Sequence, residues 1–252
     1  MLSLEQERRR FTQQAAWTKA IRQYIYQQID IKCCRNVLEV GCGEGVILAD
    51  FAGGFSGEVH GFDRRLDALL FASRSAPPTG VLTCGDACCL PYPDAYFDVT
   101  LCHFTLLWLK DPLSGLKEMA RVTRPGGWVA ALAEPDFGGR IDYPEPLASL
   151  GRMQALALSR QGADPDLGRQ LSGLLHRAGL TEIQTGLLGG QWQGSFSESE
   201  WQGEWEILKD DLRNDLTPAE MDCLRKLDHK ARLEGERLLF VPTFYGWGRV
   251  LP

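Results

Sequence analysis

The stretch that decides the fold is Val37-Leu-Glu-Val-Gly41-Cys-Gly43-Glu-Gly45. A short apolar strand runs into three glycines at alternate positions, and we expect a short helix to follow over residues 44–52. Glycine lets the backbone turn sharply and approach a ligand closely, and the free N–H groups at the start of the next helix point at that ligand. The stretch therefore predicts a strand, a ligand-binding loop and a helix in succession.

The spacing of these glycines differs from that of a dinucleotide-binding loop. That fingerprint is GxGxxG, which would place the third glycine at position 46. Position 46 is Val, and the third glycine is Gly45. Arg64 and Arg65, after the second expected strand, suggest an NADP-dependent oxidoreductase as an alternative, and the glycine spacing argues against it.

Strands alternate with helical stretches around this loop. Helices are expected at 64–74 and 112–122, and apolar strands at 36–40, 58–62, 80–84, 97–102 and 128–133. Such alternation predicts an open parallel sheet with helices on both faces. Ligands of these sheets bind at the carboxyl ends of the strands, so we expect the residues that follow each strand to gather at one site.

The residues at the strand ends are of the types that bind a nucleoside. Asp63 ends the second strand, 22 residues after Gly41, and a carboxylate there can accept hydrogen bonds from both ribose hydroxyls. Gly85-Asp86-Ala87 ends the third strand, and Cys102-His103 ends the fourth. Each of these residues has a structural alternative: Asp63 could cap a helix, Asp86 could start a turn, and His103 could be a core histidine.

Four segments over about residues 36–135 together resemble the class I S-adenosylmethionine-dependent methyltransferases. They are VLEVGCGEG, GFD, GDACCLPYPDAYFDVTLCHFTLLWL and EMARVTRPGGWVAALAEPD, and their order and spacing are specific although none of them is alone. The resemblance implies an α/β fold: a Rossmann-like, doubly wound, mostly parallel seven-stranded sheet with the last strand antiparallel, plus a helical lid. It also implies S-adenosyl-L-methionine as the cofactor.

The resemblance assigns roles to individual residues. The methionine part of the cofactor would face the glycine loop and the end of the fourth strand: Glu39, the backbone of Gly41, Cys42 and Gly43, and then Cys102 and His103. The nucleoside would lie against the ends of the second and third strands: Asp63 at the ribose, Arg64 beside the adenine, Asp86 at the adenine amine and the Ala87 amide near a ring nitrogen.

We expect a single domain over residues 1–252. It would comprise an N-terminal helical cap (1–30), a cofactor-binding core (36–135), helical insertions on the acceptor side (136–163 and 190–235) and a final strand (238–250). Helical stretches are expected at 4–29, 147–161, 166–178 and 198–234, a strand at 181–188 and a loop at 135–146. Trp201, Trp205 and Leu208 match a helical core stripe, and together with Trp192 and Phe196 they would alternatively line an apolar acceptor pocket.

Methyl transfer leaves little catalytic signature in a sequence. The protein mainly holds a nucleophile in line with the methyl–sulfur bond and excludes water, and a general base helps only when the acceptor is protonated. No catalytic residue is therefore assigned. Candidate acceptor contacts are Glu134, Asp136 and Tyr143 after the fifth strand, and candidate cap residues are Arg10, Gln14, Trp17 and Thr18.

Charge and composition narrow the choice of partner. The chain has 27 Lys and Arg against 33 Asp and Glu, and residues 198–215 alone hold seven acidic side chains, which disfavours nucleic acid and acidic lipid. A small-molecule or peptide acceptor is favoured, and a non-catalytic cofactor-binding module is the alternative. The acceptor atom and the oligomeric state are left open.

The remaining features favour a cytoplasmic protein without a metal. No apolar run approaches the roughly 18–20 residues of a membrane span, and the N-terminal MLSLEQERRRF lacks the apolar segment of a secretory signal. The eight cysteines include two adjacent pairs and no CxxC spacing, and Cys84 and Cys88 have no second pair with which to form a zinc site. We expect free thiols in a reducing compartment.

Overall fold

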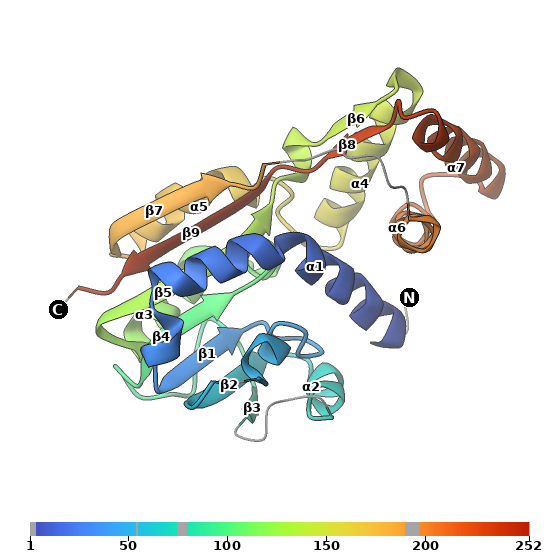
Figure 1. The fold of residues 1–252 in the computed structure, drawn as a ribbon. Helices are drawn as coiled ribbons and strands as arrows, with labels where there is room; N and C mark the ends of the chain where they lie inside the picture. Colours follow the sequence, from blue (N-terminus) through green and yellow to red (C-terminus); the bar gives the residue numbers. More distant parts are fainter. Residues whose placement is uncertain (1–3, 54, 75–79, 190–196, 252) are drawn as a thin grey trace.

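A seven-stranded sheet runs through the centre of the computed structural model, which describes residues 4–53, 55–74, 80–189 and 197–251 (Figure 1). The strand order is β3-β2-β1-β4-β5-β9-β7. The strands are β1 (Asn36–Val40), β2 (Glu58–Asp63), β3 (Gly80–Cys84), β4 (Phe97–Cys102), β5 (Thr123–Pro135), β7 (Thr181–Leu187) and β9 (Thr243–Arg249). Strands β1 to β5 pair in parallel, and β9 is antiparallel to both β5 and β7. This confirms the predicted mostly parallel sheet with an antiparallel last strand.

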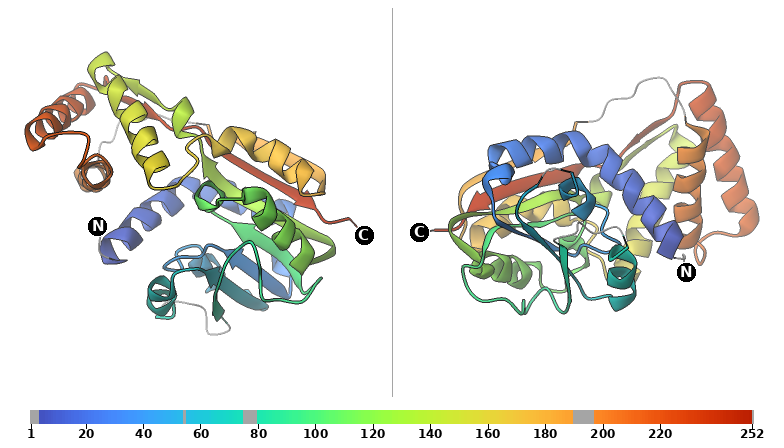
Figure 2. Two further views of the ribbon diagram at one scale, coloured as in Figure 1. Left: turned by 180° about the vertical axis from the view of Figure 1, so that it is seen from behind. Right: turned by 60° about the horizontal axis from the view of Figure 1, so that its bottom comes forward.

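Helices cover both faces of this sheet (Figures 1 and 2). On one face α1 (Leu4–Gln28) and α2 (Leu66–Ala72) bury Ile25 and Leu69 against the strands. On the other face α3 (Pro112–Val122) and α5 (Leu167–Arg177) bury Leu116 and Leu171. Strand β4 is buried at every position, as expected for a parallel strand between two helical layers.

A second, smaller unit lies beyond the carboxyl end of β5 (Figures 1 and 2). It consists of α4 (Ala148–Arg160), α6 (Glu198–Asp211), α7 (Pro218–Leu233) and a two-stranded sheet of β6 (Ile141–Tyr143) and β8 (Leu238–Phe240). Its own core buries Leu147, Leu150, Ala157, Trp201, Trp205, Leu208, Leu212 and Met221. Trp201, Trp205 and Leu208 are therefore core residues rather than pocket walls, while Trp192 and Phe196 lie outside the described residues. We call this unit, together with the turn η4 (Phe137–Gly139) that packs on α4, the acceptor cap, after the role proposed for it below.

The helix expected over residues 44–52 is wrong. Gly43 and Gly45 adopt φ values of +49° and +77°, which a right-handed helix does not accommodate. The chain instead forms a series of turns, in which the Gly45 N–H donates to the Cys42 carbonyl at 2.9 Å. Only a 3₁₀ turn, η2 (Leu48–Phe51), follows. Four further 3₁₀ turns are η1 (Ile31–Cys33), η3 (Leu106–Trp108), η4 (Phe137–Gly139) and η5 (Glu145–Leu147).

The single final strand expected over residues 238–250 is also wrong, because the chain changes sheets within it. Strand β8 pairs with β6 in the acceptor cap, and β9 pairs with β5 and β7 in the large sheet. Pro242 separates the two, since it has no N–H to donate, and its carbonyl accepts a bond from Asp136 N at 2.7 Å. The 135–146 loop in turn contains β6, which the sequence did not predict.

The acidic helical stretch 198–234 forms two helices. Thr217 begins α7 with a capping box: its hydroxyl accepts from Glu220 N, and the Glu220 carboxylate accepts from Thr217 N at 2.8 Å. Pro218 occupies the first turn, where its missing N–H costs nothing. Among the described residues, no helix has the combination of length and apolar character that a bilayer span requires.

Candidate functional site

A cavity of about 860 Å³ opens at the carboxyl ends of β1 to β4, beneath the N-terminal half of α1. Its volume lies within the range of small-molecule sites, roughly 300–1,000 Å³. The glycine loop and the strand ends form one side. The opposite side is formed by the acceptor cap, through the ends of α4 and α6 and through η4.

Nine of the ten residues expected at the site line this cavity: Glu39, Gly41, Cys42, Gly43, Asp63, Arg64, Asp86, Ala87 and His103. Cys102 does not. Its side chain is fully buried beneath the strand end, with its sulfur 3.9 Å from Oε1 of Glu134. Cys102 is the last residue of β4 and belongs to the core, whereas His103 follows the strand and reaches the cavity.

The glycine loop is fixed by its backbone and is open above. Gly41 N and Cys42 N both donate to the Phe62 carbonyl, at 2.7 and 3.0 Å, which ties the loop to the end of β2. Gly41 has a φ of +76°, and a Cβ there would collide with the Thr105 side chain. At Gly43 a Cβ would meet nothing nearer than a Phe11 carbon at 4.0 Å. A ligand can therefore approach the loop closely at Gly43.

Asp63 holds the loop and still has capacity for a ligand. Its Oδ2 accepts from Gly43 N and its Oδ1 from Arg65 N, each at 2.9 Å. An ionised carboxylate has about four acceptor positions, so each oxygen retains one for a ligand hydroxyl. Arg65, not Asp63, is the N-cap residue of α2, and no side chain caps that helix. Asp86 similarly accepts from Cys88 N through its Oδ1, at 2.9 Å.

Glu39 is a buried carboxyl group with an unused oxygen. It is 2% exposed, and its Oε2 has no hydrogen-bond partner among the described residues. Burial, and next the negative charge of Asp50, raise the pKa of Glu39 to about 8. A buried acceptor without a donor is costly, so a ligand ammonium placed here would satisfy it. A positively charged or N–H-bearing ligand group is therefore the chemistry that this oxygen fits.

His103 is held by α1 and is a weak base. Its Nε2 lies 2.9 Å from the hydroxyl of Thr18, which accepts from Arg22 Nη1 at 2.7 Å. Arg22 is in turn paired with Asp50 at 2.9 Å. Burial, and next the charge of Arg22, lower the pKa of His103 to about 3. The imidazole is therefore neutral near pH 7 and poorly suited to remove a proton from an acceptor.

The candidate contacts at and beyond the end of β5 do not line the cavity. Glu134 is fully buried and accepts from Thr105 N and Leu106 N, at 3.0 Å each, at the start of η3. Asp136 is buried against Arg169, and Tyr143 is exposed on β6. Of the candidates on α1, Arg10 and Gln14 line the cavity, Trp17 is exposed, and Thr18 acts through His103.

Sequence reasoning missed two groups of lining residues. One group surrounds the loop and consists of Glu44 and Glu7. Glu44 is fully buried, and burial is the main cause that raises its pKa to about 7. Glu7 lies on α1, and its carboxylate is 2.7 Å from Arg65 Nη1. The other belongs to the acceptor cap: Phe137, Leu158, Gln161, Asp210 and Asp211. The second group lies within the expected acceptor-side insertions, 136–163 and 190–235, but only the three-dimensional arrangement shows which of their residues reach the cavity.

Comparisons with known proteins agree with this geometry. A family model described as a methyltransferase domain matches residues 38–131. An uncharacterized methyltransferase of Schizosaccharomyces pombe is 31% identical over 63% of this chain and 61% of its own length. The demethylmenaquinone methyltransferase of Bacillus licheniformis is 35% identical over 51% and 56%. The chain thus spans about three fifths of these two relatives.

Another relative matches along most of both chains. It is a probable S-adenosylmethionine-dependent methyltransferase of Mycolicibacterium smegmatis, 30% identical over 81% of this chain and 83% of its own length.

Two solved structures share the fold. The YcgJ protein of Bacillus subtilis has a TM-score of 0.57 at 18% identity, over 90% of this chain and 97% of that one. Phosphoethanolamine N-methyltransferase 2 of Haemonchus contortus, solved with phosphomonomethylethanolamine and S-adenosylhomocysteine, has a TM-score of 0.58 at 15% identity, over 86% and 49%. With the sheet topology and the glycine loop described above, these matches show that the chain belongs to the class I S-adenosylmethionine-dependent methyltransferases.

Proposed function

We propose that this methyltransferase transfers the methyl group of S-adenosylmethionine to a small-molecule or peptide acceptor by in-line displacement. The observation that carries the proposal is the continuity of one cavity. Its lining includes Glu39, Asp63 and His103 on the sheet side and side chains of the acceptor cap such as Leu158 and Asp211. With a volume of about 860 Å³, this one cavity has room for the cofactor and for a second molecule beside it.

Residues of the strand ends would hold the cofactor. The free oxygen of Glu39 suits the cofactor ammonium, and the unused acceptor positions of Asp63 suit the ribose hydroxyls. Asp86 has one carboxylate oxygen left for the adenine amine, beside Ala87 and Arg64. Gly41, Cys42 and Gly43 supply backbone with little side-chain bulk, which lets the methionine part lie against the loop.

The reaction needs positioning more than proton transfer from this chain. The bound cofactor supplies an electrophilic methyl carbon on a sulfonium. Residues of α1 and the acceptor cap close around the site, hold the acceptor in line and exclude water. The low pKa of His103 makes it a contact of the cofactor or acceptor, held by Thr18, rather than a general base.

The cavity walls favour a small acceptor over a nucleic acid. The acceptor cap presents two adjacent acidic side chains, Asp210 and Asp211, where a polyanion would be repelled. Demethylmenaquinone and phosphomonomethylethanolamine, named with two of the comparison proteins, are small molecules. All eight cysteines are free thiols, which suits a reducing compartment, and we place the activity in the cytoplasm.

Two measurements test this proposal. S-adenosylhomocysteine should raise the unfolding temperature of the purified protein, and NADP⁺ should not, because the loop lacks a third glycine at position 46. A labelled-methyl transfer screen against pooled metabolites and pooled peptides should then place the label on one pool. Stabilisation by NADP⁺ alone, or label transferred only to added RNA or DNA, would refute the proposal.

A further inference from the structure

Asp211 is a buried carboxylate at the acceptor end of the cavity. It is 7% exposed, ends α6, and lines the cavity together with Gln161 and Leu158 at the end of α4. Its Oδ2 accepts from Gln154 Nε2 at 2.9 Å, and its Oδ1 accepts a longer bond from Gln161 Nε2 at 3.4 Å. Both donors are neutral amides, so neither compensates the negative charge.

The neighbouring cations are engaged elsewhere. Arg213 pairs with Asp210 at 2.6 Å, and Arg160 pairs with Asp215. No Lys, Arg or His of the described residues forms an ion pair with Asp211. A buried charge is stable when it is paired, and a neutral acceptor closing this cavity would displace water from Asp211 without replacing it. Lys110 also lines the cavity, but it is exposed and forms no ion pair with Asp211, so a ligand cation can supply the counter-charge.

A buried network fixes the orientation of Gln154. Arg140 Nη1 donates to the Gln154 carbonyl oxygen, and because arginine has only donors, the Gln154 amide nitrogen must face Asp211. Arg140 forms a two-pronged pair with Asp142, at 2.7 and 3.0 Å, and both side chains are nearly inaccessible to solvent. Gln154 is thus a positioning residue for the Asp211 carboxylate.

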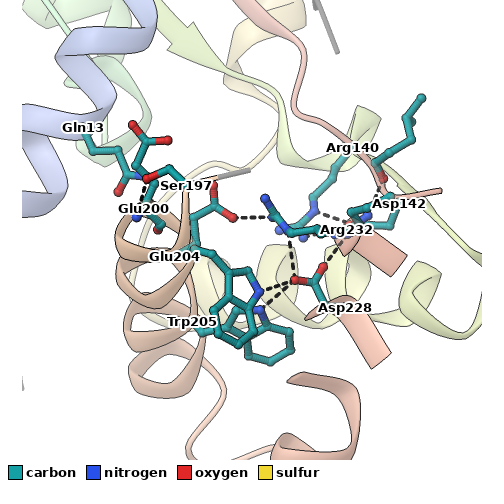
Figure 3. Close-up of polar contacts among 12 residues, drawn as sticks. Gln13, Arg140, Asp142, Ser197, Glu200, Glu204, Trp205, Asp228 and Arg232 are labelled. Atoms are coloured by element: carbon teal, nitrogen blue, oxygen red, sulfur yellow. Dashed lines mark hydrogen bonds and ion pairs between the residues drawn. The ribbon is translucent and has the colours of Figure 1, made fainter. Parts of the chain in front are cut away.

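The same network extends across the whole acceptor cap (Figure 3). Arg237 joins Asp142, at 2.6 Å, to Asp228. Asp228 accepts from the indole N–H groups of Trp201 and Trp205, at 2.6 and 2.9 Å, and Arg232 links it to Glu204. A buried network of this kind is rigid only when each of its polar groups has a hydrogen-bond partner. Asp211 is the member of the network that lines the cavity.

On the basis of the proposed function, we propose that the methyl acceptor carries a positively charged nitrogen that pairs with Asp211. The acceptor also has an apolar body, because Trp108, Phe137 and Leu158 line the same cavity as Asp211. The acceptor class is therefore a small apolar amine or a peptide side chain with a cationic end. Asp211 selects it by charge, while the cofactor residues on the opposite side of the cavity are the same for any acceptor.

A matched pair of probes tests this inference. Protein saturated with S-adenosylhomocysteine is titrated with 2-phenylethylamine, which is protonated at neutral pH, and with 2-phenylethanol, its neutral counterpart. Because hydrogen bonds to charged groups are the strong ones, the amine should bind at least about tenfold more tightly than the alcohol. Asp211→Asn should bring the amine affinity down to that of the alcohol and leave the alcohol affinity unchanged.

Asp215→Asn is the matched control, since it removes the same charge from the same acidic segment at a residue that does not line the cavity. It should keep the tenfold preference. Gln154→Met should reduce the ratio of amine to alcohol affinity without changing the alcohol affinity, which a general loss of packing would not do. Gln154→Asn should restore part of the ratio.

The outcomes separate the two proposals. Failure of the wild-type protein to bind S-adenosylhomocysteine counts against the proposed function. Normal S-adenosylhomocysteine binding without a preference for the amine, including no binding of either probe at millimolar concentration, overturns the role of Asp211 alone. The same holds if Asp211→Asn retains the preference.

Discussion

The two sides of the cavity recognise ligands by different means. On the cofactor side, the backbone of the glycine loop and single carboxylates at strand ends form the surface, and residues near one another in the sequence lie together. On the acceptor side, side chains from α4, α6 and η4 line the cavity, and a buried ionic network that spans 140–237 positions Asp211. One side depends on the fold and the other on a particular set of side chains, so one can be shared across a family while the other determines specificity.

The largest expected effect is a loss of folding stability that originates in the acceptor cap. Asp228→Ala leaves Arg237, Arg232 and two indole N–H groups without their buried partner, which should lower the free energy of unfolding by about 3–5 kcal/mol. Chemical denaturation followed by tryptophan fluorescence measures it, because Trp201 and Trp205 lie in this core. Asp222→Ala, an exposed pair with Lys226 on the same helix, is the control and should leave the midpoint unchanged.

The affinity for S-adenosylhomocysteine sharpens the comparison in that experiment. At temperatures where Asp228→Ala remains folded, the affinity should stay near that of the wild-type protein, because none of the cofactor residues contacts the network. A parallel loss of cofactor affinity would mean that the two sides form one cooperative unit and that the distinction is false.

The same difference explains what the sequence predicted. Asp63 and Asp86 were found because each follows a strand, and parallel strands bring their carboxyl ends to one edge. Cys102 was expected at the cavity, but it is still part of β4 and its side chain is buried beside Glu134. The helix expected after the loop does not form, because glycines with positive φ continue to Gly45. Asp211 and Gln154 gave no signal, since an acidic helix looks the same whether its end faces solvent or a cavity.

The next largest effect tests the cofactor side. Asp63→Ala should weaken S-adenosylhomocysteine binding by roughly 1–3 kcal/mol, about 5- to 150-fold, because it removes the acceptors for the ribose hydroxyls and releases Gly43 N. Isothermal titration calorimetry measures the loss. Asp67→Ala is the control, since Asp67 also bonds Arg65 but is exposed and outside the cavity. Equal affinity of a folded Asp63→Ala protein and the wild type would remove the ribose assignment.

The last expected effect concerns the pH dependence of cofactor binding through Glu39. Burial keeps this carboxyl largely protonated below its pKa of about 8, whereas an ammonium favours the ionised form. Binding should therefore release a proton, and the affinity for S-adenosylhomocysteine should rise from pH 6 to 8 by up to about tenfold per pH unit. Titrations in two buffers of different ionisation enthalpy count that proton. Glu39→Gln should bind more weakly, without the proton release.

The carboxyl group of Glu39 should also make the stability of the ligand-free protein depend on pH, in the opposite direction. A folded-state pKa raised from 4.5 to about 8 means that the unfolded chain ionises first, so the free energy of unfolding falls as the pH rises through that interval. Glu39→Gln should make the decline shallower. Glu134, whose pKa burial raises to about 7 away from the cavity, is the comparison: Glu134→Gln should also flatten the stability profile but keep the pH-dependent cofactor affinity. If both variants lost that dependence, the proton would belong to the core rather than to the cofactor site.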